Sequence, residues 1–281
     1  MEYNPYIYAD LHMHTCCSDG TFTPYQIVKL AEENHLDAIS ITDHDTIAGI
    51  NPAQEIAKND RLKVIPGIEL STKSTLRMHI LGYFININDK SLADLLDKLA
   101  RAKKSLLAKT IKRIRETDST FSLKDIVDAG KYCSATRIKY MLSKEHPAHK
   151  RGEFYDSFLE ISRAWHEYLL TPEECISIIH RAQGLAVLAH PILLGLTEQK
   201  LENVIKDLRN CGLDGIEIKH PEQNVSYQAR ISKIVTKYGL FETGGSDIHG
   251  TGLTSGKYNA KEFAFMISEN NAIYKRIMEI R

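Results

Sequence analysis

The sequence predicts an α/β barrel whose strands end in side chains of the types that bind metal ions. Three observations support this fold class. The chain has 281 residues, 43% of them hydrophobic, which is enough for one large α/β domain. Short β-prone segments alternate with segments of helical periodicity. The predicted strands end on His, Asp or Glu, and a barrel brings such ends to one opening.

The first third of the chain alternates strand and helix. β-branched and aromatic residues favour the strands, and Thr23-Pro24 is typical of a helix start, with an N-cap followed by proline at the first helical position. An extended chain alternates its side chains between two faces, so His12 and His14 are expected to point the same way. The expected strands are 6–9, 38–42, 62–69 and 76–84, and the expected helices are 23–35 and 46–58.

Residues 91–174 differ from the rest of the chain. Leucines there recur at helical spacing, as at Leu92, Leu95, Leu96 and Leu99, and no strand-like alternation is present. The α/β pattern resumes afterwards, so we predict a helical insertion, or lid, in a barrel domain formed by residues 1–90 and 175–281.

The last third again alternates helix and strand. Thr171-Pro172 repeats the signature of a helix start, and a closing amphipathic helix is expected over 261–281. Seven candidate strands in the whole chain suit a (β/α) barrel smaller or more distorted than the eightfold one. A doubly wound open sheet is the alternative, but its single crevice would hardly gather ligands from so many strands. The expected strands here are 184–190, 213–220 and 240–249, and the other helices are 171–180, 198–210 and 225–238.

Charge and cysteine content limit the classes of function. Lys+Arg 36 balances Asp+Glu 36, so the chain has no overall charge to bind long duplex nucleic acid or an anionic membrane. Five cysteines without a CxxC motif argue against a disulfide framework and for a reducing compartment. No signal-like N-terminus or long apolar stretch is present, so we expect a soluble, cytoplasmic protein.

Nine residues near the strand ends are candidate metal ligands. Taken singly, each has an ordinary explanation: His44 as a turn residue, Glu69 as a surface carboxylate, His79 as a hydrogen-bonded histidine. Taken together they exceed what one ion of four to six ligands can use, so two or three ions are expected. Imidazole and carboxylate without thiolate favour Mn²⁺, Fe²⁺ or Zn²⁺, with Mg²⁺ as a further candidate. The nine are His12, His14, Asp19, His44, Glu69, His79, His190, Asp247 and His249.

Several motifs in order along the chain resemble those of the PHP (polymerase and histidinol phosphatase) family of phosphoesterases. The resemblance implies a distorted (β/α)7 barrel with three metal ions. It assigns His12, His14, Glu69 and Asp247 to the first ion, a bridging Glu69 with His79 and His190 to the second, and Asp19, His44 and His249 to the third. The motifs are Asp10-Leu11-His12-Met13-His14-Thr15, Ser18-Asp19-Gly20, Asp43-His44-Asp45, Pro66-Gly67-Ile68-Glu69, Ala189-His190-Pro191 and Gly245-Ser246-Asp247-Ile248-His249-Gly250.

The insertion resembles the PHP branch that contains nucleoside 3′,5′-bisphosphate phosphatase and a 5′-to-3′ exoribonuclease. Arg137 holds the position of a substrate-phosphate ligand in that branch, although the run Ala135-Thr136-Arg137-Ile138-Lys139 lacks the branch's Pro-His. The expected substrate is therefore a nucleoside 3′,5′-bisphosphate or 5′-mononucleotide, with short RNA ends, histidinol phosphate and cyclic phosphates as alternatives. A metal-binding domain without activity and a hydrolase of carbon–nitrogen bonds are the alternatives from other classes.

The expected reaction is attack of a metal-bridging hydroxide on phosphorus. His220 is the candidate for a phosphate contact or for the acid that protonates the leaving oxygen, and a loop histidine held by Pro221 is an equal alternative. Asp43, with Asp45, is expected to orient the ligand imidazoles.

Overall fold

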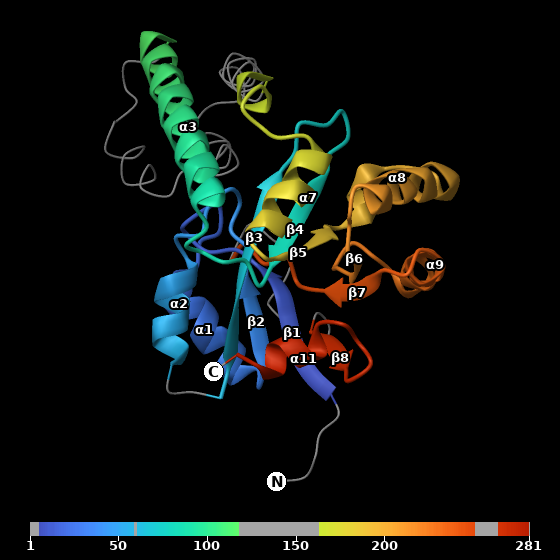
Figure 1. Cartoon of the computed structure of the whole chain (residues 1–281). Helices are drawn as coiled ribbons and strands as arrows, with labels where there is room; N and C mark the ends of the chain where they lie inside the picture. Colours follow the sequence, from blue (N-terminus) through green and yellow to red (C-terminus); the bar gives the residue numbers. More distant parts are fainter. Residues whose placement is uncertain (1–5, 59–60, 118–162, 251–263, 281) are drawn as a thin grey trace.

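The computed structural model describes residues 6–58, 61–117, 163–250 and 264–280. At its centre is an eight-stranded sheet in the order β7-β6-β5-β4-β3-β2-β1-β8. The sheet curls into a nearly closed barrel with helices outside it, which confirms the predicted fold class (Figure 1). The strands are β1 (Tyr6–Met13), β2 (Ala38–Ile41), β3 (Lys63–Ser71), β4 (His79–Tyr83), β5 (Leu185–Leu188), β6 (Gly215–Lys219), β7 (Phe241–Gly244) and β8 (Phe265–Ser268).

The helices follow the strands as the periodicity predicted. Thr23 and Thr171 both form capping boxes, so the two predicted helix starts are confirmed. The helices are α1 (Pro24–Glu33), α2 (Ile50–Ala57), α3 (Lys90–Thr117), α7 (Pro172–Arg181), α8 (Glu198–Asn210), α9 (Val225–Lys237) and α11 (Tyr274–Met278), with the 3-10 helix η1 (Pro191–Leu194). None of these described helices is both long and apolar enough to cross a membrane.

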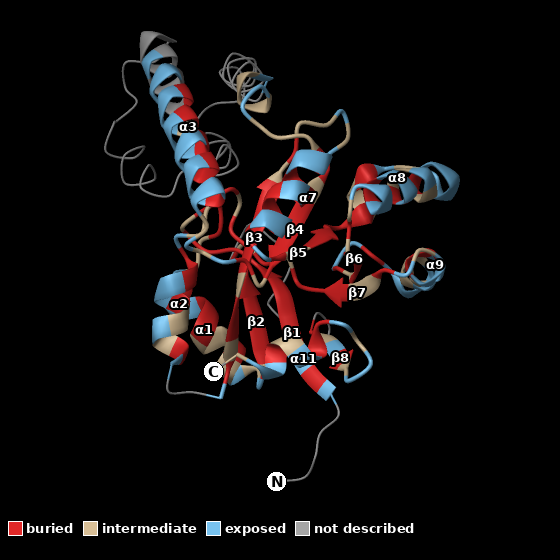
Figure 2. Ribbon diagram, in the orientation of Figure 1, coloured by how far each residue is buried: buried red, intermediate tan, exposed pale blue. Residues whose placement is uncertain are grey.

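Both faces of the sheet are buried. The cluster enclosed by the strands includes Leu11, Ile65, Leu81 and Val187, and a larger cluster fills the space between the sheet and the outer helices. Residues of strands β2 to β6 are accordingly almost all buried, whereas β8 and the start of β1 have exposed residues and the helices are exposed on their outer faces (Figure 2).

The segment that follows β7 also contacts β1. The His14 amide donates to the Ile248 carbonyl at 3.0 Å, and Met13 and Ile248 form a parallel bridge. The Ser246 amide donates to Asp10 Oδ1 at 2.9 Å. These contacts bring the segment after β7 beside the carboxyl end of β1.

The structure settles one feature that the sequence left open and contradicts one prediction. β4 is antiparallel to both neighbours, because the short connection from β3 leaves no room for a crossover helix. The single closing helix expected over 261–281 is wrong for the described part of that range, which holds β8 and the short α11. β8 pairs antiparallel with β1 and alternates an exposed Met266 with a fully buried Ile267, which is the period of a strand.

Within the predicted insertion, the structure describes helix α3, of 28 residues, and a short segment from 163 that leads into α7. Leu95 and Leu99 of α3 are buried in the outer core, as the helical spacing predicted. Arg137 lies outside the described residues, so its role as a phosphate ligand stays a prediction.

Candidate metal centre

The structure brings all nine predicted ligands together at the opening formed by the strand ends. His12, Glu69 and His79 belong to strands β1, β3 and β4. The others follow strands directly or lie in the loop after β1: His14, Asp19, His44, His190, Asp247 and His249. The rule that barrel strands present their ends to one opening therefore holds for this set.

The first group consists of His12, His14, Glu69 and Asp247, whose ligand atoms all lie within 4.8 Å of one another. Both His12 Nε2 and His14 Nε2 lie 3.3 Å from Glu69 Oε2. Asp247 Oδ1 lies 3.3 Å from His12 Nε2 and 3.0 Å from His14 Nε2. Two imidazole nitrogens thus face two carboxylate oxygens, the arrangement expected around one cation.

The second group uses the other oxygen of Glu69. Glu69 Oε1 lies 2.9 Å from His79 Nδ1 and 3.0 Å from His190 Nε2. Because the two oxygens of one carboxylate face different sets of imidazoles, Glu69 has the geometry of a bridging ligand.

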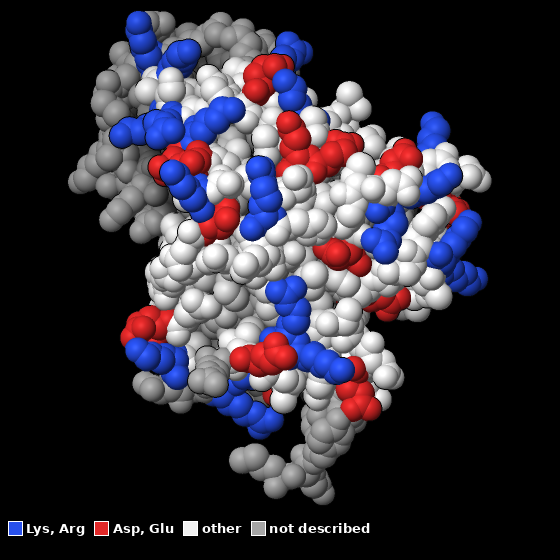
Figure 3. Space-filling view, viewed as in Figure 1, with Lys and Arg blue, Asp and Glu red and all other residues white. Residues whose placement is uncertain are grey.

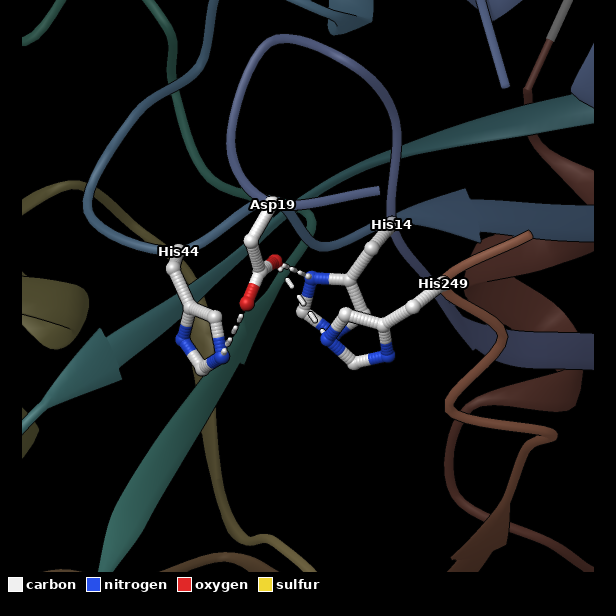
Figure 4. Close-up of side chains that lie close together, drawn as sticks. All are labelled: His14, Asp19, His44 and His249. Atoms are coloured by element: carbon white, nitrogen blue, oxygen red, sulfur yellow. Dashed lines mark ion pairs between the residues drawn. The ribbon is translucent and has the colours of Figure 1, made fainter. Parts of the chain in front are cut away.

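The third group surrounds Asp19 and is shown in Figure 4. Asp19 Oδ1 lies 3.3 Å from His249 Nε2 and 3.6 Å from His14 Nδ1, and Asp19 Oδ2 lies 3.9 Å from His44 Nε2. His44 also places Nδ1 3.1 Å from Glu69 Oε2. His14 and His44 therefore lie between groups, each with one nitrogen toward Asp19 and one toward Glu69.

Buried polar atoms without partners test whether this donor set fits metal ions. His12 Nε2, His14 Nε2, Glu69 Oε2 and Asp247 Oδ1 are all buried and lack a hydrogen-bond partner. Leaving a buried polar atom unpaired costs about 1–3 kcal/mol, so four such atoms facing one another would be unfavourable without a cation among them. The residues fit a metal centre.

The pKa values show how strongly these groups interact. Burial alone would raise the pKa of Glu69, but the imidazoles of His44, His79 and His12 hold it well below its usual range. Burial lowers the pKa of His44 to about 3. Burial opposes protonation of His14 as well, yet the nearby carboxylates of Asp247 and Glu69 raise its pKa to about 10. The centre therefore contains ionised carboxylates, which are the charge state that binds metal.

Comparison with known proteins identifies the family. The PHP domain matches residues 10–238. This chain belongs to the PHP family. The resemblance of its motifs to that family is thereby confirmed.

Relatives of this PHP chain are named as phosphoester hydrolases. It is 27% identical to phosphoribosyl 1,2-cyclic phosphate 1,2-diphosphodiesterase of Eggerthella lenta, over 86% of this chain and 94% of that one. It is 27% identical to the 5′-3′ exoribonuclease of Escherichia coli, over 85% and 84%. It is 26% identical to the 3′,5′-nucleoside bisphosphate phosphatase of Chromobacterium violaceum, over 86% and 87%.

A solved structure supports the fold independently. An amidohydrolase of Chromobacterium violaceum with bound sulfate superimposes with a TM-score of 0.75 at 19% identity, covering 96% of this chain and 95% of that one. At this identity the likeness concerns the barrel architecture.

Asp43 and Asp45 of this PHP domain have partners other than those predicted. Asp43 accepts hydrogen bonds from the Thr15 amide and hydroxyl, both at 2.7 Å, and from the Ser18 hydroxyl at 2.5 Å. Asp45 accepts from the amide and hydroxyl of Ser71. In the part of the chain that the structure describes, neither carboxylate hydrogen-bonds to an imidazole. Asp43 instead fixes the loop that carries Asp19.

His220 lies at the edge of the centre. Its Nδ1 accepts a hydrogen bond from the Glu222 amide at 3.1 Å, so the neutral ring carries its proton on Nε2. That Nε2 lies 3.3 Å from Asp247 Oδ2. The buried ring thus directs an N–H group toward the centre, although its role there stays a prediction.

Sequence reasoning missed Glu217 in β6, which is fully buried and hydrogen-bonds to His12. Its signal was a single carboxylate between Ile216 and Ile218 in an apolar strand. Carboxylates are almost never fully buried unless they are paired, so a lone Glu in an apolar strand indicates a buried partner.

Proposed function

We propose that this PHP domain hydrolyses a phosphate monoester of a small nucleotide, a nucleoside 3′,5′-bisphosphate or a 5′-mononucleotide. Two or three divalent ions, Mn²⁺, Fe²⁺ or Zn²⁺, would be held by the nine residues around Glu69. The convergence of these nine on one opening, with unpaired buried atoms facing one another, carries the proposal.

When bound, such ions lower the pKa of water and polarise phosphoryl oxygens. Glu69 would keep the first two sites at a fixed separation, because its two oxygens face different imidazoles. Asp43 holds the loop of Asp19 and so fixes one wall of the third site. His220 would donate its Nε2 proton to the phosphate or to the leaving oxygen.

The substrate class is supported by the relatives, which act on cyclic phosphate, RNA and nucleoside bisphosphate according to their names. A phosphate ester attached to a nucleotide or ribose is common to these substrates. We place Arg137 of the insertion at the remote phosphate of the substrate, on the strength of the motif alone.

Trimming of short 5′-phosphorylated RNA is the second candidate. Besides the similarity to the exoribonuclease, helix α3 exposes Lys98, Arg101 and Lys104, which could lie beside a phosphodiester chain.

Phosphate release tests the proposal. Protein loaded with Mn²⁺ is assayed against nucleoside 3′,5′-bisphosphates, 5′-mononucleotides, sugar phosphates and a 5′-phosphorylated oligoribonucleotide. We expect the highest kcat/KM on a nucleotide monoester and a loss on the order of 100-fold or more in His14→Ala. His180→Ala is the matched control, because His180 pairs with Asp214 on the surface and is not among the nine. Phosphate release that is unchanged in His14→Ala or after metal removal would contradict the proposal.

A further inference from the structure

Glu217 is a buried carboxylate whose partners are two of the candidate metal ligands. Its side chain is fully buried, between Ile216 and Ile218 on β6. Burying a carboxylate is costly unless hydrogen bonds satisfy it. The groups that donate these hydrogen bonds therefore indicate the role of the Glu217 carboxylate.

One oxygen of Glu217 determines the tautomer of His12. Glu217 Oε1 lies 3.0 Å from His12 Nδ1, and an ionised carboxylate can only accept, so the ring proton is on Nδ1. In the neutral ring, His12 Nε2 is then the lone pair, directed toward Glu69 Oε2 and Asp247 Oδ1, each at 3.3 Å. This is the tautomer that can bind an ion in the first group.

The other oxygen of Glu217 holds the backbone of His190. The His190 amide donates to Glu217 Oε2 at 2.7 Å. His190 has φ 26° and ψ 62°, a left-handed conformation that is unfavourable for a residue with a side chain. Its ring meanwhile places Nε2 3.0 Å from Glu69 Oε1, in the second group. The hydrogen bond to Glu217 therefore supports a strained backbone that aims a ligand.

We propose that Glu217 is a positioning residue that couples the first and second metal sites. It orients His12 through the ring and His190 through the backbone, from the opposite side to the bridging Glu69. In the residues that the structure describes, Glu217 makes no hydrogen bond to Asp19, His44 or His249, so the third site is independent of it. This inference rests on the metal centre of the proposed function and adds a residue to which no motif assigned a role.

Glu217→Gln tests the coupling with little change of volume. The amide oxygen can accept from only one side, so its NH₂ group faces either the His190 amide or His12 Nδ1. Either His12 takes the wrong tautomer or His190 loses its support. We expect Mn²⁺ affinity to fall about 10- to 100-fold at two sites together. The remaining site should keep its affinity and should be lost when His249→Ala is added.

Thr243→Val is the matched control. Thr243 lies opposite Glu217 on the neighbouring β7 and is fully buried, and within the described structure no candidate ligand hydrogen-bonds to its hydroxyl. The substitution perturbs the same barrel interior without touching a ligand, so metal affinity should not change. The proposal would be overturned if Thr243→Val lost as much Mn²⁺ affinity as Glu217→Gln. It would also be overturned if Glu217→Gln lost affinity equally at all three sites, or lost none.

Nitrogen NMR of the metal-free wild-type protein provides a test that needs neither a folded variant nor activity. We expect the His12 ring, once neutral at alkaline pH, to carry its proton on Nδ1, with the tautomer altered or averaged in Glu217→Gln. A wild-type His12 protonated on Nε2 alone would overturn the inference. If the wild-type protein bound no metal, the proposed function would fail while the tautomer result would still decide whether Glu217 orients His12.

Discussion

Glu69 is the side chain that the largest number of other candidate ligands face. Its Oε2 lies within 3.3 Å of nitrogens of His12, His14 and His44, and its Oε1 within 3.0 Å of His79 and His190. No other carboxylate among the nine has this arrangement in the described structure. A change at Glu69 should therefore affect more than one ion.

Glu69→Gln should weaken metal binding at the first two sites together, because a neutral amide oxygen is a weaker ligand and the NH₂ group cannot bind a cation. His249→Ala should instead empty mainly the third site, where its Nε2 lies 3.3 Å from Asp19 Oδ1. Elemental analysis of protein prepared with Mn²⁺ measures both. Metal content equal to wild type in Glu69→Gln would contradict the bridging assignment, and fewer than two ions in the wild type would contradict the multinuclear centre.

The candidate ligands could be predicted from the sequence because His, Asp and Glu recur at the ends of the predicted strands. His12 and His14 have a spacing that places both on one side, and their rings lie with centroids 5.1 Å apart. Asp43 was assigned the wrong partners, because the folding of residues 15–18 back over the end of β2 cannot be inferred from local sequence. Glu217 was missed because a lone carboxylate has no spacing pattern; only its burial and contacts reveal its role.

At the level of elements, strand β1 leads into the His12 and His14 positions of the site. It also contains an irregularity that the sequence does not show. Its register with β2 shifts between Asp10 and Met13, and Asp10 Oδ1 accepts from the His12 amide at 3.2 Å. Bulges of this kind redirect side chains near active sites. The strand itself followed from its β-branched and aromatic residues. The shift begins at Asp10, which also accepts a hydrogen bond from the Ser246 amide after β7.

Gly245 permits that contact. A Cβ at this position would lie 2.4 Å from His12 Cβ and 2.5 Å from the His12 amide nitrogen. Gly245→Ala should therefore push the segment after β7 away from β1, lower the free energy of unfolding by about 1–3 kcal/mol, and reduce metal content at the first site. Chemical denaturation and elemental analysis measure the two effects.

Gly239→Ala is the control for Gly245→Ala. Gly239 has φ +61° and nothing within 4 Å of its would-be Cβ, so alanine there is strained by its backbone alone. Stability should fall by about 1 kcal/mol while metal content stays at the wild-type value. A Gly245→Ala protein with full metal content would show that the close approach does not position His12.

The antiparallel β4 and the added β8 show which aspects of topology the sequence concealed. The direction of a strand in the sheet depends on the length and path of the segment that connects it to the preceding strand. Hydrophobic periodicity alone determines neither of them. The helix expected over 261–281 gives way to strand β8, although Ile273, just before α11, and Ile277 within it do have helical spacing. Burial of Ile267 beside exposed Met266 separates the two elements.

At the level of the whole molecule, the buried histidines make stability of the metal-free protein depend on pH in two directions. The pKa of His44 is lowered to about 3, so the unfolded chain takes up that proton near 6.5 and the folded chain does not. Stability is therefore lost as the pH falls from 6.5 toward 3. The pKa of His14 is raised to about 10, so its contribution is complete below 6.5 and is lost as the pH rises toward 10.

Metal-stripped protein should accordingly have its highest melting temperature near pH 6.5, with losses on both sides. Thermal melts in a chelator across that range check the expectation. His14→Gln should reduce the alkaline loss and His44→Gln the acidic one. Addition of Mn²⁺ should abolish the alkaline loss, because a metal replaces the His14 proton. A melting temperature that rises steadily toward alkaline pH in the chelator would contradict the expected loss of stability on deprotonation of His14.

Surface charge decides which nucleic acids could compete for the opening. The chain is neutral overall, with 36 basic and 36 acidic residues, and Figure 3 shows both signs interspersed over the face it presents. The exception is helix α3, where Lys98, Arg101, Lys104 and Lys109 are exposed and no acidic residue lies between Lys98 and Lys109. One basic helix can contact a few phosphates, whereas long duplex binding requires many such contacts and weakens steeply with salt.

Long duplex DNA or RNA should therefore inhibit hydrolysis of a nucleotide monoester weakly, and raising the salt concentration from about 50 to 200 mM should change kcat/KM by less than about tenfold. Substitution of Lys98, Arg101 and Lys104 by Gln should leave hydrolysis of a mononucleotide unchanged, because the metal centre supplies its phosphate contacts. The same variant tests the surface of α3. Long duplex could inhibit the wild-type protein tightly, lose this effect at high salt, and fail to inhibit the variant. In that case α3 is a nucleic-acid-binding element and the preference for small substrates is wrong. Inhibition that is weak in both proteins would mean that selectivity arises at the opening itself, where nine ligand-type side chains and His220 converge.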